Sequence, residues 1–96
     1  MEEESMYPAE TTEVAATGTA RTGSGKLLGG VLTAGADAAT ATIYDNTSAA
    51  GKVLRTVKAP AGTTVDIGVP AGGIRFGTGL HAVLAGTGPK LYLEFS

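Results

Sequence analysis

The stretch KLYLEF, residues 90–95, carries the clearest structural pattern in the chain. Leu91, Leu93 and Phe95 alternate with Tyr92 and Glu94, so apolar and polar side chains take opposite positions along the segment. A period of two is typical of a β-strand that buries one face, because successive side chains of a strand point to opposite sides. The stretch therefore predicts a strand that lies against an apolar core.

The same kind of short apolar or alternating segment recurs along the rest of the chain after residue 25. The segments are KLLGGVLTA (26–34), TATIYD (40–45), KVLRTVK (52–58), TTVDIGV (63–69), GIRF (73–76) and LHAVLA (80–85). Gly, Pro, Asn and Asp separate them, and these residues favour turns. Six or seven short strands joined by polar turns predict an all-β fold, a small antiparallel β-sandwich or barrel. The pair Gly29-Gly30 inside the first segment predicts a bulge or a close approach of two backbones.

The first 25 residues have a different composition from the rest. Glutamates crowd the beginning, at positions Glu2, Glu3, Glu4, Glu10 and Glu13, and no Lys or Arg occurs before Arg21. The first thirteen residues thus carry about −5 and the remainder about +3. Without apolar periodicity, this composition favours an extended segment. We expect residues 1–25 to form an extended acidic N-terminal arm and residues 26–96 to form one β domain.

Size and composition exclude several classes of protein. A chain of 96 residues and 9.5 kDa is expected to form a single domain with a thin core, which association with other copies would stabilise. The absence of cysteine and the single histidine, His81, exclude disulfides and make a structural zinc site untenable. No apolar run approaches the length of a membrane-spanning helix. The acidic start differs from a secretory signal, so synthesis in the cytoplasm without export by that route is expected.

The segment ARTGSGKLL, residues 20–28, has the spacing of a phosphate-binding P-loop but lacks its chemistry. Ala20 replaces the first glycine, and Leu27 stands where a Ser or Thr would hold Mg²⁺. The residues after it contain three glycines, Gly29, Gly30 and Gly35, and show no helical pattern. No helix N-terminus is therefore expected there to bind the phosphates. We interpret it as the joint between the arm and the β domain.

No other pattern in the sequence predicts catalysis or a bound cofactor. His81 lies in an alternating strand segment without a recognisable acid or nucleophile beside it, so a position on a sheet face is the simpler interpretation. Asp45 precedes Asn46 in a turn-like segment, where its carboxylate would accept backbone N–H groups. The basic residues are scattered and have no aromatic platform, which argues against nucleic-acid binding. We therefore expect no catalytic residues, no metal and no cofactor.

The order of strands and turns resembles that of small virion proteins of tailed bacteriophages. The resemblance covers about residues 26–95 and is carried by ATIYDNTS (41–48), GKVL (51–54), FGTGL (76–80) and Gly86. In those proteins a leading strand runs into a segment of the form AT-x-x-x-YDN-x-S, and a later F-x-x-GL precedes a final strand of alternating apolar residues. The arm lies outside the match.

The resemblance implies a structural, non-enzymatic role in a phage particle, most specifically that of a capsid decoration (cement) protein. Such proteins sit on the outer surface of the shell, often as trimers, and bridge neighbouring capsomers. The expected partners are the major capsid protein and other copies of the chain, with no nucleic acid and no membrane. The expected arm contacts are its only sizeable apolar residues: Met6, Tyr7, Pro8 and Val14.

Two alternatives remain open at this stage. The first is another place in the virion: the tail, the head–tail connector or the base of a fibre. The second is a small carbohydrate- or receptor-binding β domain, which would need an exposed aromatic cluster. Tyr44 and Tyr92 are the candidates for such a cluster.

Overall fold

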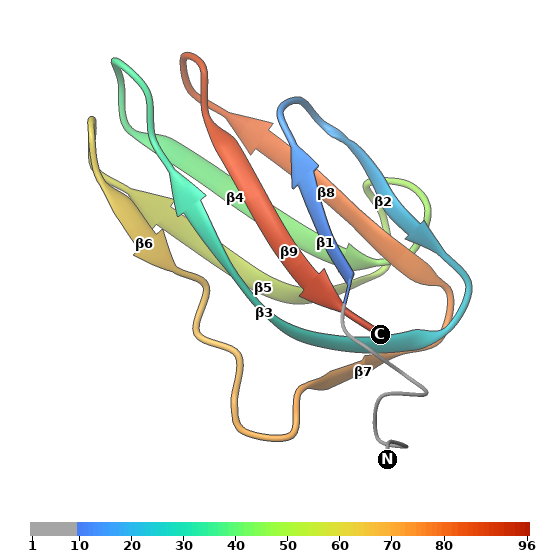
Figure 1. Ribbon diagram of the computed structural model, residues 1–96. Coiled ribbons are helices and arrows are strands. Elements are labelled where there is room, and N and C mark those ends of the chain that lie inside the picture. The colour runs from blue at the N-terminus through green and yellow to red at the C-terminus, as the bar shows by residue number, and fades with distance from the viewer. Residues whose placement is uncertain (1–9) are drawn as a thin grey trace.

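A computed structural model describes residues 10–96, which form nine β-strands and no helix. The strands are β1 (Glu10–Val14), β2 (Gly18–Thr22), β3 (Gly25–Thr33), β4 (Ala39–Asp45), β5 (Lys52–Ala59), β6 (Thr64–Asp66), β7 (Ile74–Phe76), β8 (Gly79–Ala85) and β9 (Lys90–Phe95). They pair entirely in antiparallel fashion and make two sheets that face each other (Figure 1). The predicted all-β sandwich class is confirmed.

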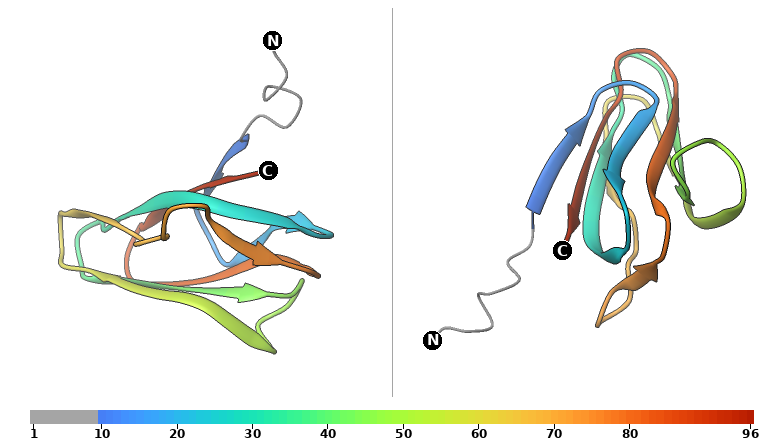
Figure 2. Two further views of the ribbon diagram at one scale, coloured as in Figure 1. Left: turned by 90° about the horizontal axis from the view of Figure 1, so that it is seen from below. Right: turned by 90° about the vertical axis from the view of Figure 1, so that its right-hand side faces the viewer.

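The two sheets are built from strands that are distant in the sequence. The first, sheet A, has the order β1-β9-β3-β6, and β7 also pairs with β3. The second, sheet B, has the order β2-β8-β4-β5. The views in Figure 2 show the two layers. Most connections between consecutive strands cross from one sheet to the other. Only the β4–β5 hairpin joins two neighbouring strands of one sheet without leaving it.

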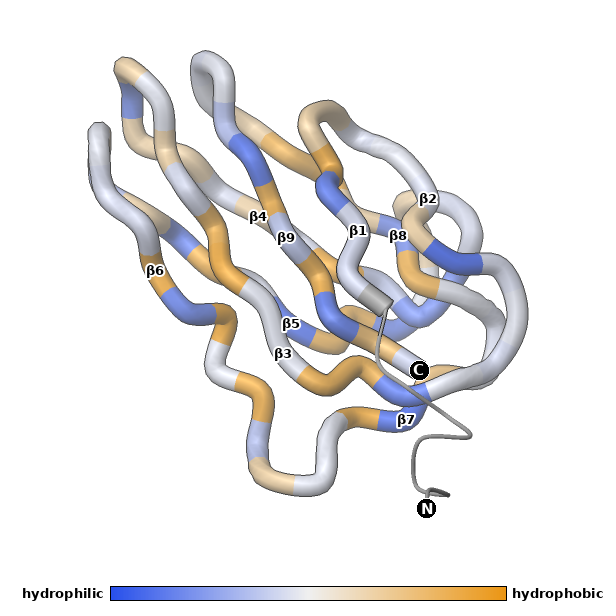
Figure 3. The backbone as a smooth tube through the Cα atoms, in the orientation of Figure 1, coloured by the Kyte–Doolittle hydropathy of each residue, from blue (hydrophilic) through white to orange (hydrophobic). Residues whose placement is uncertain are grey.

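The core lies between the sheets and is formed by the inward residues of each strand. Its largest fully buried side chains are Phe76, Phe95, Leu27, Leu32, Ile43, Leu80, Leu91 and Leu93. Along β9 the buried residues alternate with partly or fully exposed ones, as the sequence pattern predicted. The same alternation of apolar and polar residues is visible along the strands in Figure 3. Burial of these side chains is the main force that holds the sheets together.

The seven strands expected after residue 25 are all present, with shifted ends. The largest difference is in TTVDIGV, where β6 covers only residues 64–66. There the Asp66 carboxylate accepts a hydrogen bond from the Gly68 amide at 2.6 Å. This local turn ends the strand, and Ile67 nevertheless enters the core with 3% of its surface exposed.

The described part of the expected arm belongs to the sandwich rather than projecting from it. β1 pairs with β9 from Glu10 opposite Phe95 to Val14 opposite Leu91. β2 pairs with β8 in the other sheet. The expected boundary between residues 25 and 26 therefore does not separate two structural units. β1 and β2 contribute little to the core: chiefly Val14 from β1 and Ala20 from β2. Because so few of their side chains are buried, neither strand shows an apolar pattern in the sequence.

The segment 20–28 connects the two sheets. It contains the end of β2, the link at residues 23–24 and the beginning of β3. Gly23 has a φ of 101°, which a residue with a side chain rarely adopts, and its amide donates to the Thr78 carbonyl at 2.8 Å. Gly23 thus serves a turn, as expected of a joint, but the joint lies between sheet B and sheet A.

The predicted irregularity at Gly29-Gly30 is confirmed. The pairing of β3 with β9 shifts register between Leu27 and Gly29, which marks a bulge. A side chain at Gly30 would collide with the backbone carbonyl of Tyr92. Glycine at this position therefore allows the close approach of β3 and β9.

Candidate interaction surfaces

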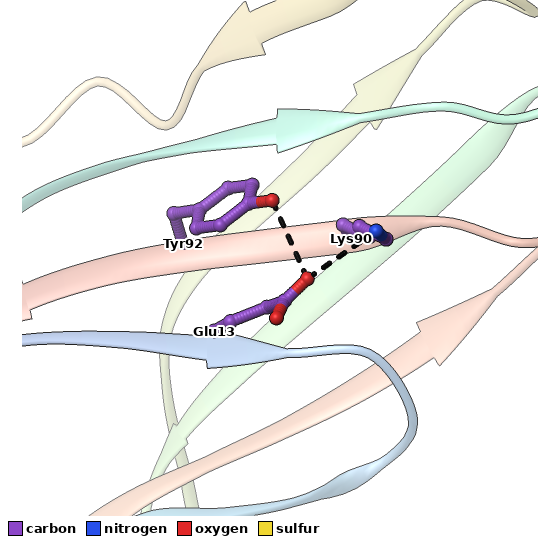
Figure 4. Close-up of polar contacts among 3 residues, drawn as sticks. All are labelled: Glu13, Lys90 and Tyr92. Carbon is purple, nitrogen blue, oxygen red and sulfur yellow. Dashed lines mark hydrogen bonds and ion pairs between the residues drawn. The ribbon is translucent and has the colours of Figure 1, made fainter.

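On the outer face of sheet A, polar contacts of one glutamate link the edge strand β1 to its neighbour β9. The Tyr92 hydroxyl donates to Glu13 Oε2 at 3.3 Å, and Lys90 Nζ lies 3.6 Å from the same oxygen (Figure 4). The Lys90 and Glu13 side chains are about half exposed, at 55% and 45%, so their ion pair is worth at most about 1 kcal/mol. The position of β1 therefore rests on its backbone pairing with β9, to which these side-chain contacts add little.

The four residues expected to contact a neighbour divide into two groups. Met6, Tyr7 and Pro8 lie outside the described residues. Val14 is only 7% exposed and packs in the core of its own chain. Because a buried side chain has no surface to offer, Val14 supports the fold and does not belong to a contact surface.

Beside β1, the outer face of sheet A contains a shallow hollow of about 270 Å³. Gly29 and Gly30 provide its floor without side chains, while Tyr92, Glu94 and Asp66 stand around it. Leu28, which also lines it, is 38% exposed. The hollow combines apolar surface with two carboxylates.

On the outer face of sheet B, one tyrosine lies at the centre of the strand register. Tyr44 of β4 lies between His81 of β8 and Val53 of β5 in the strand register. His81 Nδ1 is 2.9 Å from the Thr19 hydroxyl, which donates to the Thr47 carbonyl at 3.1 Å. His81 is thus a sheet-face residue in contact with β2, in agreement with the simpler interpretation of the sequence.

The two tyrosines of the proposed aromatic cluster lie on different sheets. Ile43 beside Tyr44 and the neighbours of Tyr92 on both sides, Leu91 and Leu93, are buried, so both tyrosines point outward from the sandwich. Tyr44 belongs to sheet B and Tyr92 to sheet A. They therefore occupy opposite outer faces and do not form one stacking surface.

A second hollow, of about 600 Å³, lies at the end of the sandwich where β2 turns into β3. Arg21, Lys26 and Arg75 line it, together with Phe76 and residues of the adjoining turns. We call this feature the basic hollow. Two contacts position the Arg21 side chain: its guanidinium lies 5.8 Å from the centre of the Phe95 ring and donates to the Ser24 carbonyl at 3.3 Å.

Sequence reasoning missed the basic hollow because its cations are far apart in the chain. Lys26 and Arg75 are 49 positions apart, and they meet because β3 pairs with β7 in a register that places them opposite each other. Arg21 joins them through the β2–β3 link. Only this pairing reveals that three of the seven basic residues gather at one end.

Asp45 closes the other side of the same end. Its carboxylate accepts backbone hydrogen bonds from Gly77 at 3.1 Å and Thr78 at 2.9 Å, with a longer one from Gly79 at 3.4 Å. The Thr78 and Gly77 amides lower the pKa of Asp45 below its ordinary value of 3.8. The expected carboxylate–amide contacts are thus present, but they come from the β7–β8 link, while Asn46 binds the turn that follows it.

Replacing Asp45 with asparagine is expected to lower the free energy of unfolding by about 1 kcal/mol near neutral pH, because the charged acceptor of the Gly77 and Thr78 amides becomes a neutral one. Because the folded-state pKa is lowered, this contribution is present above the ordinary pKa and disappears as the pH falls through the folded value. Urea unfolding of both proteins between about pH 7 and pH 2 measures it. The difference in free energy of unfolding between wild type and Asp45→Asn should shrink toward zero at the acidic end. Glu94→Gln, at an exposed position, serves as the control. A difference independent of pH would contradict the assignment.

Residues 10–96 contain neither a metal-binding cluster nor a membrane-spanning helix. In residues 10–96, His, Asp and Glu side chains do not gather in groups of three or more that could hold a metal ion. The same residues contain no helix long and apolar enough to cross a membrane.

Comparisons of the chain with protein-family models, with curated proteins and with solved structures found no match.

Proposed function

We propose that the protein is a structural component of a tailed-phage virion, a capsid decoration (cement) protein that binds the outer surface of the shell and bridges capsomers. Its partners are the major capsid protein and further copies of itself. Two lines of support are independent of each other. One is the resemblance of residues 26–95 to small virion proteins, and the other is the edge that the fold leaves open.

The observation that carries the proposal is the position of β1 and β2. Among the described strands, each pairs with one neighbour only and forms an edge of its sheet. Both lie on the same side of the sandwich, drawn in blue in Figure 1. Such edges present unpaired backbone groups that a strand of another chain can extend. The acidic segment with Met6, Tyr7 and Pro8 leads directly into this side.

Many copies of a small module are suited to stabilising a shell. Each copy needs to contribute only a weak contact, because repeated contacts on one particle act together. A protein that binds the assembled shell but not its dissociated subunits shifts the equilibrium toward the shell by mass action. In this mechanism residues 1–9 bind a neighbouring subunit, and the sandwich supplies the rigid body.

Removal of residues 2–9 is expected to abolish binding to virions of the phage that encodes the chain and to leave the sandwich folded. The deletion must stop there, because residues 10–22 belong to the two sheets. Sedimentation with particles lacking the protein measures binding, and circular dichroism checks the fold. Full-length Val53→Ser, which changes an exposed residue on the opposite edge of sheet B, is the control. Unaltered binding of the truncated chain would contradict the role of the arm.

The number of copies in each virion separates the capsid from the tail. Quantitative mass spectrometry should find copies in the hundreds if the protein decorates the shell. A few dozen copies or fewer would place it in the tail, the connector or a fibre base instead. No association with particles would overturn both assignments.

A further inference from the structure

The basic hollow carries a net positive charge that the structure leaves facing solvent. Lys26 and Arg75 are exposed, and among residues 10–96 no acidic side chain lines the hollow. Asp45 does not line the hollow, and its carboxylate accepts hydrogen bonds from the amides of Gly77 and Thr78. The Ser96 backbone also lines the hollow and is bonded to Lys26 in both directions, at 3.1 and 3.0 Å.

We propose that the basic hollow binds the acidic segment Glu2–Glu4 of the same chain. The segment offers three carboxylates to three cations, and no other run of consecutive acidic residues occurs in the sequence. Opposite charges of this density attract over distances comparable with the Debye length. Arginine and lysine also bind carboxylates through charge-assisted hydrogen bonds. The inference concerns the isolated protein and does not depend on the proposed place in a virion.

The length of the chain outside the described residues fits this assignment. Glu10 lies opposite Phe95, and Phe95 lies opposite Leu27, so the start of β1 is two strand spacings, about 10 Å, from β3 near Lys26. Arg75 is one further spacing away, across β3. The six residues from Glu4 to Glu10 span up to about 20 Å when extended. The segment is therefore long enough to reach the hollow without disturbing β1.

The hollow of the same chain is favoured over that of a second copy by proximity. A short tether holds the segment at an effective concentration in the millimolar range, which exceeds that of a dilute protein. On a crowded particle, neighbouring hollows would compete for the same segment. The intramolecular contact is consequently a property to be measured in dilute solution.

Paramagnetic relaxation tests the proposal, because the chain has no cysteine and Ser5→Cys accepts a single nitroxide label. The label is expected to broaden the amide signals of Gly25, Lys26 and Gly77 strongly. In about 1 M NaCl, where the Debye length falls to about 3 Å, the broadening should decrease at least about twofold. Lys26→Gln/Arg75→Gln should cause the same decrease.

The matched control is Lys52→Gln/Lys58→Gln, which removes two exposed cations from β5 and should leave the broadening unchanged. Charge exchange, Glu3→Lys/Glu4→Lys combined with Lys26→Glu/Arg75→Glu, should restore it, which a merely structural effect of the substitutions would not do. Equal broadening in wild type and in the Lys26/Arg75 variant would overturn the proposal. So would broadening that appears equally when labelled and isotope-enriched chains are different molecules, since the segment would then occupy a second copy.

Discussion

Replacing Gly30 with alanine is expected to destabilise the protein by about 2–3 kcal/mol or more, although only one methyl group is added. The new Cβ would overlap the Tyr92 carbonyl oxygen and come within 3.3 Å of the Ile67 and Leu93 side chains. A carbonyl in a paired strand cannot rotate away, so β3 and β9 must separate. For a domain of this size the midpoint of thermal unfolding should fall by roughly 10 °C or more.

Gly29→Ala is the matched control, because it makes the same chemical change one residue earlier. Its Cβ would meet only Glu94 Oε1, at 3.4 Å, and that side chain is flexible and exposed. Alanine in a strand also avoids the entropic cost of glycine, so this variant should match wild type or gain about 0.5 kcal/mol. Thermal unfolding followed by circular dichroism measures both. Equal effects of the two substitutions would mean that β3 and β9 do not approach each other as closely as described.

The strands after residue 25 could be predicted from the sequence because the apolar residues in each one mark the positions that are buried. Leu91, Leu93 and Phe95 alternate with polar residues regardless of which strand lies beside them. No comparable pattern in the sequence indicates which strands pair with one another. β9 lies between β1 and β3, which are about 60 to 80 positions away in the chain, and nothing in KLYLEF indicates either neighbour.

β1 and β2 were not predicted for a related reason. An edge strand with one core residue resembles an extended segment, and Glu13 stays at the surface in either case. What makes ETTEV a strand is the partner it finds in β9, a tertiary effect that outweighs local pattern. The same holds for the basic hollow, whose cations are brought together by register. For Asp45, the sequence predicted that backbone amides would donate to the carboxylate but not which ones, since these amides belong to the β7–β8 link more than 30 positions away.

Replacing Leu93 with alanine is expected to lower the free energy of unfolding by about 2–5 kcal/mol, because Leu93 is fully buried and its truncation leaves a cavity in the core. The position is especially sensitive because β9 is an inner strand of sheet A, paired with Thr12 of β1 on one side and with Gly30 of β3 on the other. A loss of this size is a large part of the stability of an ordinary small domain.

The neighbouring Glu94→Ala serves as the control, since Glu94 is exposed and the change should stay within about 0.5 kcal/mol. Denaturant unfolding of the three proteins measures the difference. Because β1 pairs with β9 along its whole length, Leu93→Ala should also weaken the protection of β1 amides against hydrogen exchange. If those amides exchanged no faster than in wild type, β1 would owe its position to something other than β9, and residues 10–14 would have to be assigned to the arm after all.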